Sequence, residues 1–278
     1  KAKLAKAKAK QSMAVVLPAN FDVSKLNFEE IKSLKSGMKI VKVNYDGGSL
    51  NMQTPEVRLP FDVSEYKDND NFKYSFQCSL DNIEGNKAMK DLFTKLSDID
   101  QAVRNFAKDN SMAFFKKKTM TDETIDQLYN PIVKVSRDPE TGEPNGKYAP
   151  SFKVKFTKRD GKFMTKLYDN KKNVFDINGD VDVNTLLIRD TKCKLLIEFT
   201  GLWLINGKFG CGWNVVQGLV NKPKKGLDDF AFIDDGSDNV DFVDSESDDD
   251  EDEDESESEE EVVRPQPVKK TRKVKTSK

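Results

Sequence analysis

The sequence predicts a mainly β domain of the α+β class, in which an antiparallel sheet closes into a small barrel and one long helix is inserted between strands. Two observations carry this prediction. Apolar and polar residues alternate along at least five segments, whereas one segment repeats its apolar residues every three or four positions. A third observation, a dense run of acidic residues near the C-terminal end, predicts a disordered tail outside the folded domain.

Two N-terminal segments have the period of two that is typical of strands. Residues 38–43 alternate in this way, and Gly47-Gly48 predicts a turn, so a hairpin running on to Met52 is expected. Residues 72–79 form the second segment. One face of that strand carries Phe72, Tyr74, Phe76 and Cys78, and the other carries Lys73, Ser75, Gln77 and Ser79.

Residues 86–108 have a helical pattern instead. Apolar residues such as Met89, Leu92, Leu96 and Val103 recur at spacings of three and four, which predicts one long amphipathic helix. A second, shorter helix is expected at residues 121–129, with Thr121 as its N-cap and Pro131 ending it.

The C-terminal half of the domain predicts two hairpins. In the first, residues 152–157 alternate, Asp160-Gly161 form a turn, and residues 162–168 return as the second strand. In the second, residues 194–205 and 209–220 are strands that Asn206-Gly207 join. The turn dipeptides agree with the alternation on either side, which strengthens both assignments.

Charge and composition divide the chain into four parts. Residues 1–12 are predicted to be a flexible basic arm, 13–222 the folded domain, 223–261 a disordered acidic tail, and 262–278 a basic C-terminal segment. Residues 227–261 hold 20 acidic and no basic residues, and residues 262–278 hold 7 basic and no acidic ones. Removing these from the chain's 46 basic and 48 acidic residues leaves a net charge of +11 on residues 1–226. The domain is therefore expected to bind a polyanion.

Composition excludes several kinds of catalytic and metal site. The chain has no histidine, which removes the usual general base at neutral pH and every zinc site that needs a histidine. Its three cysteines, Cys78, Cys193 and Cys211, are far apart and form no CxxC pair. No phosphate-loop or dinucleotide-binding motif is present. The sequence predicts a protein that is not an enzyme and needs no cofactor or metal. No membrane association is expected, because no apolar run reaches the roughly 18–20 residues that span a bilayer.

The hairpin of residues 152–168 is the strongest candidate for a nucleic-acid surface. Its apolar face is expected to enter the core, while Lys158 and Arg159 lie at the turn. The outer face is expected to carry Lys153, Lys155, Lys162, Lys166 and Tyr168. Lysines aligned with an aromatic residue suit a groove that follows a phosphate backbone and stacks bases. The alternative is a solvated strand face whose lysines protect a sheet edge.

Two tryptophans are open to both a core and a binding interpretation. Trp203 falls on one predicted strand face with Leu195, Ile197 and Phe199, which favours the core, and base stacking is the alternative. Trp213 follows Gly212 and precedes the polar residue Asn214. Its neighbours fit a core position and a base-stacking position at the mouth of the barrel equally well.

Parts of this pattern resemble a known family. The second hairpin, with IEFTGLW at residues 197–203 and GKFGCGWNVVQ at 207–217, and YAPSFKVK at 148–155 are similar to the single-stranded DNA-binding proteins of podovirus-type phages and of nucleo-cytoplasmic large DNA viruses. The resemblance implies an OB-fold (an oligonucleotide-binding barrel), single-strand binding without strong sequence preference, and an acidic tail that recruits replication proteins. This chain differs from the family in that a basic segment follows the acidic run.

The predicted function is therefore single-stranded DNA binding in viral DNA replication and recombination. The predicted DNA-binding residues are Lys153, Lys155, Lys158, Arg159, Lys162, Lys166, Tyr168, Trp203, Lys208 and Trp213. The acidic tail is expected to compete with DNA, because a tether gives it an effective concentration on the order of millimolar. Duplex DNA or RNA as ligand, and a homodimer, stay open.

Two other functions remain as alternatives. One is a virion structural or genome-condensing DNA-binding protein, and the other is an acidic-tailed chaperone of basic proteins. The expected location is intracellular, in a host cytoplasmic virus factory or the nucleus, with packaging in the virion as a further option.

Overall fold

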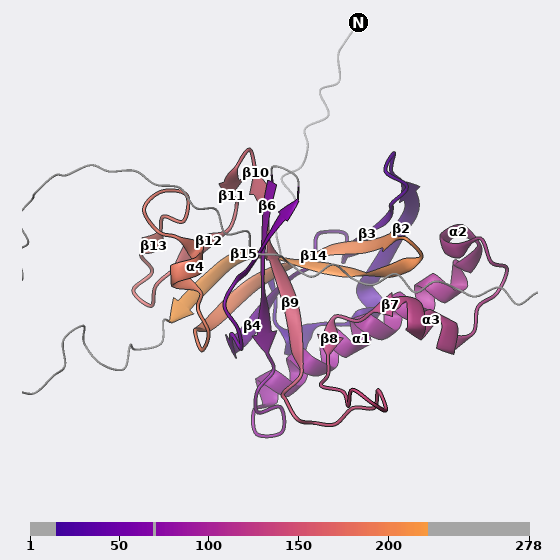
Figure 1. Cartoon of the computed structure of the whole chain (residues 1–278), viewed down its shortest axis with the longest axis horizontal. Coiled ribbons are helices and arrows are strands. Elements are labelled where there is room, and N and C mark those ends of the chain that lie inside the picture. Colours follow the sequence, from indigo (N-terminus) through magenta and orange to yellow (C-terminus); the bar gives the residue numbers. More distant parts are fainter. Residues whose placement is uncertain (1–14, 69–70, 222–278) are drawn as a thin grey trace, which may run out of the picture. The chain divides into compact units, whose positions relative to one another are not determined.

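The computed structural model describes residues 15–68 and 71–221, and they form a mostly β domain with a few helices (Figure 1). The prediction of a mainly β fold is confirmed. The predicted arm 1–12, acidic tail 223–261 and basic segment 262–278 lie outside the described residues. None of the helices in the described part combines the length and apolar character that crossing a bilayer would need.

The elements follow one another in an order that places the longest helix between two strands of the main sheet. Before it come β1 (Val15–Val16), η1 (Pro18–Asn20), η2 (Val23–Lys25), β2 (Leu26–Ser33), β3 (Lys39–Tyr45), β4 (Asn51–Arg58), β5 (Ser64–Asp68) and β6 (Asn71–Ser79). The helical region holds α1 (Lys87–Asp109), α2 (Ser111–Phe115) and α3 (Asp122–Leu128). After it come β7 (Tyr129–Asn130), β8 (Val133–Lys134), β9 (Ser151–Phe156), β10 (Lys158–Arg159), β11 (Lys162–Phe163), β12 (Lys166–Tyr168), β13 (Val174–Phe175), α4 (Val183–Leu186), β14 (Lys192–Ile205) and β15 (Lys208–Asn221).

Five strands of the large sheet pair in a closed ring. β4 pairs with β6, β6 with β9, β9 with β15, β15 with β14, and β14 with β4 again. The ring is not wholly antiparallel as the sequence predicted, because β9 and β15 run parallel where Lys155 faces Asn214. A parallel pair needs a long connection, and residues 157–207 between the two strands supply it.

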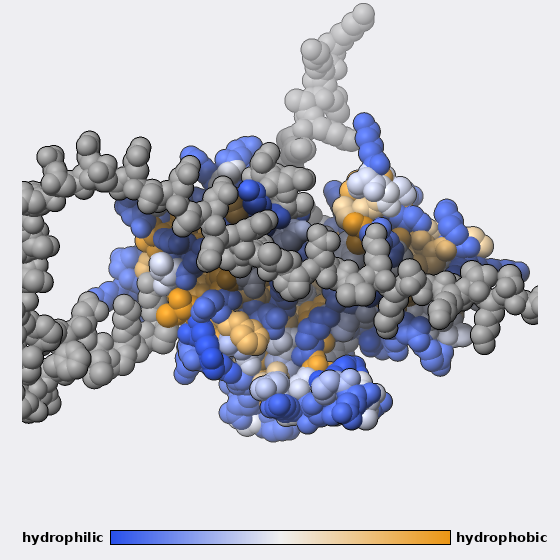
Figure 2. Space-filling view, in the orientation of Figure 1, coloured by the Kyte–Doolittle hydropathy of each residue, from blue (hydrophilic) through white to orange (hydrophobic). Residues whose placement is uncertain are grey.

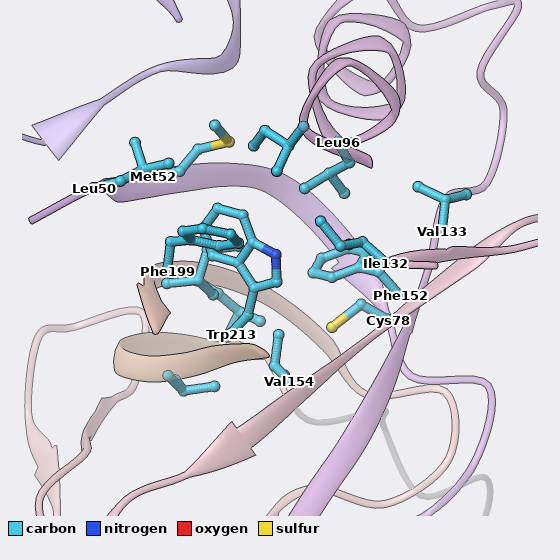
Figure 3. Packing of buried hydrophobic residues seen from close by; sticks show 14 of the residues in the cluster. Leu50, Met52, Cys78, Leu96, Ile132, Val133, Phe152, Val154, Phe199 and Trp213 are labelled. Atoms are coloured by element: carbon cyan, nitrogen blue, oxygen red, sulfur yellow. The ribbon is translucent and has the colours of Figure 1, made fainter. Parts of the chain in front are cut away.

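The interior of the ring is filled by the apolar faces of its strands. Phe152 and Val154 on β9 are fully buried, and their neighbours Lys153 and Lys155 are exposed. Trp213 on β15 is 1% exposed, and its ring packs 4.9 Å from that of Phe199 on β14. Figure 3 shows both rings within the buried cluster. Alternation along each strand therefore fixes which side chains enter the core.

Helix α1 confirms the long amphipathic helix that its spacing predicts. Asn86 caps its N-terminus by accepting a hydrogen bond from the Met89 amide at 3.2 Å. Its apolar residues, among them Leu92, Leu96 and Val103, are buried against the sheet. The buried carboxylate of Asp100 accepts hydrogen bonds from the amides of Ile132 and Val133 at 2.8 and 3.2 Å, which fixes β8 beside α1. The predicted shorter helix is α3, which Thr121 caps.

Two predicted hairpins differ from the observed pairing. The turn after β3 is present, with Asp46 and Gly47 both at positive φ, but β3 and β4 do not pair with each other. They lie on either side of β14 instead. In the predicted 152–168 hairpin only the tip pairs with itself, since β10 pairs with β11 around Asp160-Gly161. β12 pairs in parallel with the end of β15, which no local turn signal predicts.

A bulge in β14 changes which residues face the core. The register with β15 shifts between Phe199 and Leu202, around Gly201. Phe199 is buried before the shift and Leu202 and Leu204 are buried after it, so Trp203 moves to the opposite face. The prediction that Trp203 shares a face with Leu195, Ile197 and Phe199 is therefore wrong.

Candidate nucleic-acid interface

A groove of about 670 Å³ opens where β6 and β9 separate. Pairing between these strands ends at Ser75 and Lys155, so the first residues of β6 extend beyond β9. The side chains that line the groove include Phe72, Lys73, Tyr74, Lys155, Lys158 and Asn214. They come from β6, β9, the β10–β11 hairpin and β15. We call this the β6–β9 groove.

The aromatic residues of the groove belong to the same strand face as the core. Phe76 and Cys78 on β6 are buried in the ring, Tyr74 is half-buried, and Phe72 is 43% exposed. The strand is longer than the barrel is deep, so its apolar face continues into solvent. An exposed apolar face of this kind offers ring surfaces to a planar ligand.

The β10–β11 hairpin borders the groove and places one cation against two aromatic rings. The Lys158 Nζ atom lies 4.5 Å from the ring centroid of Tyr74 and 4.4 Å from that of Phe163. The two rings themselves are 5.1 Å apart in an edge-on arrangement. Asn178 holds the hairpin in place, because its side chain accepts from the Phe163 amide at 2.7 Å and donates to the Phe163 carbonyl at 3.1 Å. The cation–π contacts keep the Lys158 charge at the groove.

Three lysines gather on the outer strand face at the groove, and two of them, Lys73 and Lys155, belong to its lining. Lys153 and Lys155 point outward from β9, and Lys73 points outward from β6. The pKa of Lys155 is lowered, first by partial burial of its ammonium group and then by the positive charges of Lys153 and Lys73. A phosphate that approached would relieve this repulsion, so the cluster favours an anionic ligand.

Acidic side chains also lie near the groove. Asp160 is part of its lining. Burial, followed by the negative charge of Glu65, raises the pKa of Tyr74. Glu65 faces Tyr74 across the β5–β6 pair. The groove is therefore mixed in charge, and its positive side is the side that β9 and Lys158 form.

The structure brings together only part of the predicted binding set. Lys155 and Lys158 line the groove, while Lys153, Arg159 and Lys162 are exposed on β9 and the hairpin next to it. Lys166 lies opposite Gln217, near the end of β15. Lys208 begins β15, about 20 Å from Asn214 at the rise of a strand.

Tyr168 lies in a different depression. This second groove, of about 330 Å³, is also lined by Lys172, Lys194 and Gln217. Tyr168 has an exposed apolar residue opposite it in each neighbouring strand, Leu219 in β15 and Val174 in β13. Figure 2 shows apolar residues at the surface around β12 and β13. The predicted alignment of Tyr168 with the lysines of β9 is therefore not observed.

Neither tryptophan lines the groove. Trp213 is enclosed in the core between residues such as Phe199 and Phe152 (Figure 3), so neither of its ring faces is open to a base. Its indole N–H has no hydrogen-bond partner among residues 15–68 and 71–221. Trp203 is half-buried, and its indole nitrogen donates to the Cys211 carbonyl at 3.3 Å across the β14–β15 hairpin.

Sequence reasoning missed the aromatic residues of the groove. Phe72 and Tyr74 read as ordinary members of an alternating strand, and Phe163 lay within the expected return strand. One signal was present: the strand begins directly after the polar stretch KDNDN at residues 67–71, so its first aromatic residues were bound to lie near a loop.

Comparisons with known proteins give one family match and several distant structures. A family described as a family of unknown function (DUF5871) matches residues 79–234. No curated protein matches the chain. Its fold is similar to a single-stranded DNA-binding protein from bacteriophage Enc34 in complex with ssDNA, at 12% identity and a TM-score of 0.41, covering 72% of this chain and 97% of that chain. It is also similar to gp2.5, a single-stranded DNA-binding protein encoded by bacteriophage T7, at 9% identity and a TM-score of 0.38, covering 66% and 98%.

Proposed function

The chain belongs to DUF5871, a family of unknown function, and we propose that its β6–β9 groove binds single-stranded DNA without strong sequence preference. The observation that carries the proposal is the combination in one groove of lysines with aromatic residues, of which Phe72 is 43% exposed and Tyr74 is half-buried. Aromatic faces accept any base, and lysines neutralise phosphates whatever the sequence. The protein would then act by binding and protecting a strand rather than by catalysis.

We extend this proposal to the ring of five strands, which we assign to the OB-fold type. Such a barrel presents loops and strand faces to oligonucleotides. The pairing order supports the assignment, because β4, β6, β9, β15 and β14 return to the first strand and the long helix α1 is inserted between β6 and β9.

The acidic residues of the C-terminal region would regulate that binding. Residues 227–261 carry 20 acidic and no basic residues, whereas residues 1–226 carry a net charge of +11. We propose that the acidic region competes with DNA and, when DNA displaces it, recruits replication proteins. The setting would be replication and recombination of a viral genome.

A binding titration tests the proposal. Fluorescence anisotropy of a labelled oligothymidylate of about 16 nucleotides is compared with that of a duplex of equal length, at several salt concentrations. We expect preference for the single strand and a linear fall of log affinity with log salt. A full-length variant with the acidic residues of 244–261 changed to Asn and Gln should bind more tightly.

Three results would count against parts of this account. Equal affinity for duplex would favour a genome-condensing protein. Unchanged affinity after neutralisation of residues 244–261 would exclude competition by the acidic region. If neither the wild-type chain nor the neutralised variant bound single strands, the DNA-binding proposal would fail.

A further inference from the structure

A second basic pocket lies at the other end of β9. This cavity of about 460 Å³ is lined by three cationic side chains, Arg104 of α1, Lys134 of β8 and Arg137 of the segment that follows. Tyr129, Val133 and Val135 supply apolar and aromatic walls. Asp126 is the acidic residue of this lining. Because three cations stand against this one carboxylate, the net charge of the lining is positive. We call it the α1–β8 pocket.

The cations of the α1–β8 pocket are held in place by the fold. The Arg137 guanidinium donates to the Gly142 carbonyl at 2.8 Å. The Arg104 guanidinium lies 5.6 Å above the ring centroid of Tyr129, and its Nε is 3.6 Å from Asp126. Lys134 donates to the side-chain oxygen of Asn130, and burial lowers its pKa. A lysine whose charge is disfavoured in this way gains when an anion arrives.

Strand β9 connects this pocket to the β6–β9 groove. Lys134 pairs with Ser151 at the start of β9, and Lys155 lines the groove near its end. Figure 1 shows β9 running between β8 at one end and the β10–β11 hairpin at the other. The distance from Ser151 to Lys155 along the strand is about 13 Å. Between them Lys153 points outward, beside Gln77 and Ser75 of β6, and none of these three side chains is acidic.

From this placement we propose that the α1–β8 pocket is a second anchoring site for the phosphodiester backbone of the same strand. The inference rests on the proposed function and adds the route that the DNA backbone takes over the surface of the domain. The bases enter the β6–β9 groove, and the backbone then follows Lys155 and Lys153 along β9 to Arg137 and Lys134. A stacked strand rises about 3.4 Å per nucleotide, so the path spans at least about four nucleotides beyond the groove.

The proposal predicts that the two sites respond differently to ligand length. Anisotropy titrations use labelled oligothymidylates of about 4 and about 12 nucleotides at low salt. Arg137→Gln and Lys134→Gln should each weaken binding of the longer oligomer by about threefold to fivefold. Both should leave the shorter oligomer unchanged, because the groove alone accommodates it. The salt slope for the longer oligomer should fall by about 0.7 for each phosphate that the variant no longer neutralises.

Two further variants separate this inference from the proposed function. Lys155→Ala should weaken binding of both lengths, since it removes a charge from the groove itself. Lys32→Ala, on β2 at the far end of the sheet order, should change neither and serves as the matched control for removal of a surface charge. Equal thermal midpoints of all variants exclude unfolding as the cause.

Three outcomes overturn the second site. If Arg137→Gln and Lys134→Gln bind the longer oligomer as tightly as wild type while Lys155→Ala weakens both, the groove stands and the path along β9 is wrong. If the two variants weaken both lengths equally, the pocket acts on the groove and is not a separate anchor. If the wild-type chain binds neither oligomer, the proposed function fails, and the inference fails with it.

Discussion

The ring faces of Phe72 and Tyr74 are the surfaces on which base stacking would depend. Phe72 is 43% exposed at the outer end of β6, and Tyr74 packs against Lys158. Replacing either by alanine should cost about 1–3 kcal/mol of binding free energy, the usual value of one stacked base. Tyr74→Phe should keep most of the affinity because it keeps the ring. Direct titration with a labelled single strand measures both effects.

Phe61 provides the matched control for these substitutions. Its side chain is 60% exposed but lies outside the groove lining. Phe61→Ala should therefore leave the affinity unchanged. An equal loss in Phe61→Ala and Phe72→Ala would mean that exposed aromatic residues act nonspecifically, and it would remove the groove from the account.

The lowered pKa of Lys155 predicts a pH dependence of binding. In the free protein, burial and the charges of Lys153 and Lys73 disfavour the protonated form. A bound phosphate favours protonation and raises the pKa, so binding takes up a proton between the lowered and the raised value. Affinity should therefore fall as the pH rises through that window, by at most about one log unit per pH unit for one proton.

Lys155→Arg tests this origin, because arginine stays charged throughout that range. The pH dependence should disappear in the variant and persist in the wild type. Unfolding would not explain such a decline, since the folded state penalises protonated Lys155. Its own contribution to stability therefore rises with pH over the same window. A decline that is identical in Lys155→Arg would assign it to another group.

At the scale of single elements, the bulge at Gly201 determines the two faces of β14. Gly201 has φ +87°, and a Cβ atom there would lie 2.3 Å from the Val41 carbonyl oxygen. Gly201→Ala should lower the free energy of unfolding by more than the roughly 1 kcal/mol of an unfavourable φ alone. Gly207→Ala is the control, because Gly207 has φ +77° with open space around it. Thermal or denaturant unfolding measures the loss of stability in each variant. Gly201→Ala suffers both the steric clash and the backbone strain, whereas Gly207→Ala suffers the strain alone.

A similar loss in both glycine variants would contradict the close approach of β14 to β3 at Gly201. It would also weaken the explanation of why Trp203 leaves the core face. A larger loss in Gly201→Ala supports it.

The strands that sequence reasoning placed correctly are those with local signals. The expected strands 194–205 and 209–220 correspond to Lys192–Ile205 and Lys208–Asn221, and the expected helix 86–108 corresponds to Lys87–Asp109. Each has a clear period over most of its length and a turn or cap at its end. Trp203 was assigned poorly for a related reason: one bulge residue reverses the alternation after Gly201, and the pattern of apolar residues does not mark it. Trp213 lies on β15, and its core position was one of the two interpretations that the sequence left open.

Pairings between distant segments were beyond local patterns. β12 is three residues long and pairs in parallel with residues 217–219. Neither a turn nor a long alternating pattern in the sequence predicts this pairing. β3 and β4 are separated by β14, although a turn between them suggested a hairpin. Such contacts depend on the closed ring as a whole.

At the scale of the whole molecule, the division of charge was readable from the sequence, but the position of the groove was not. The net charge of +11 on residues 1–226 predicted a polyanion-binding domain. The lysines at positions 153, 155 and 158 were identified because they alternate with apolar residues or flank a turn. Their aromatic partners come from β6, some 80 residues earlier, and only the β6–β9 pairing brings them together.

Photo-crosslinking of the full-length chain to a single strand that carries a photoreactive thymine analogue tests the central claim most directly. Mass spectrometry then identifies the crosslinked peptides. The β6–β9 groove predicts crosslinks to Phe72 or Tyr74 of β6 and to the β10–β11 hairpin, and an excess of unlabelled single strand should suppress them more than an excess of duplex. Crosslinks confined to the Tyr168 groove or to Trp203, or equal suppression by duplex, would contradict the account.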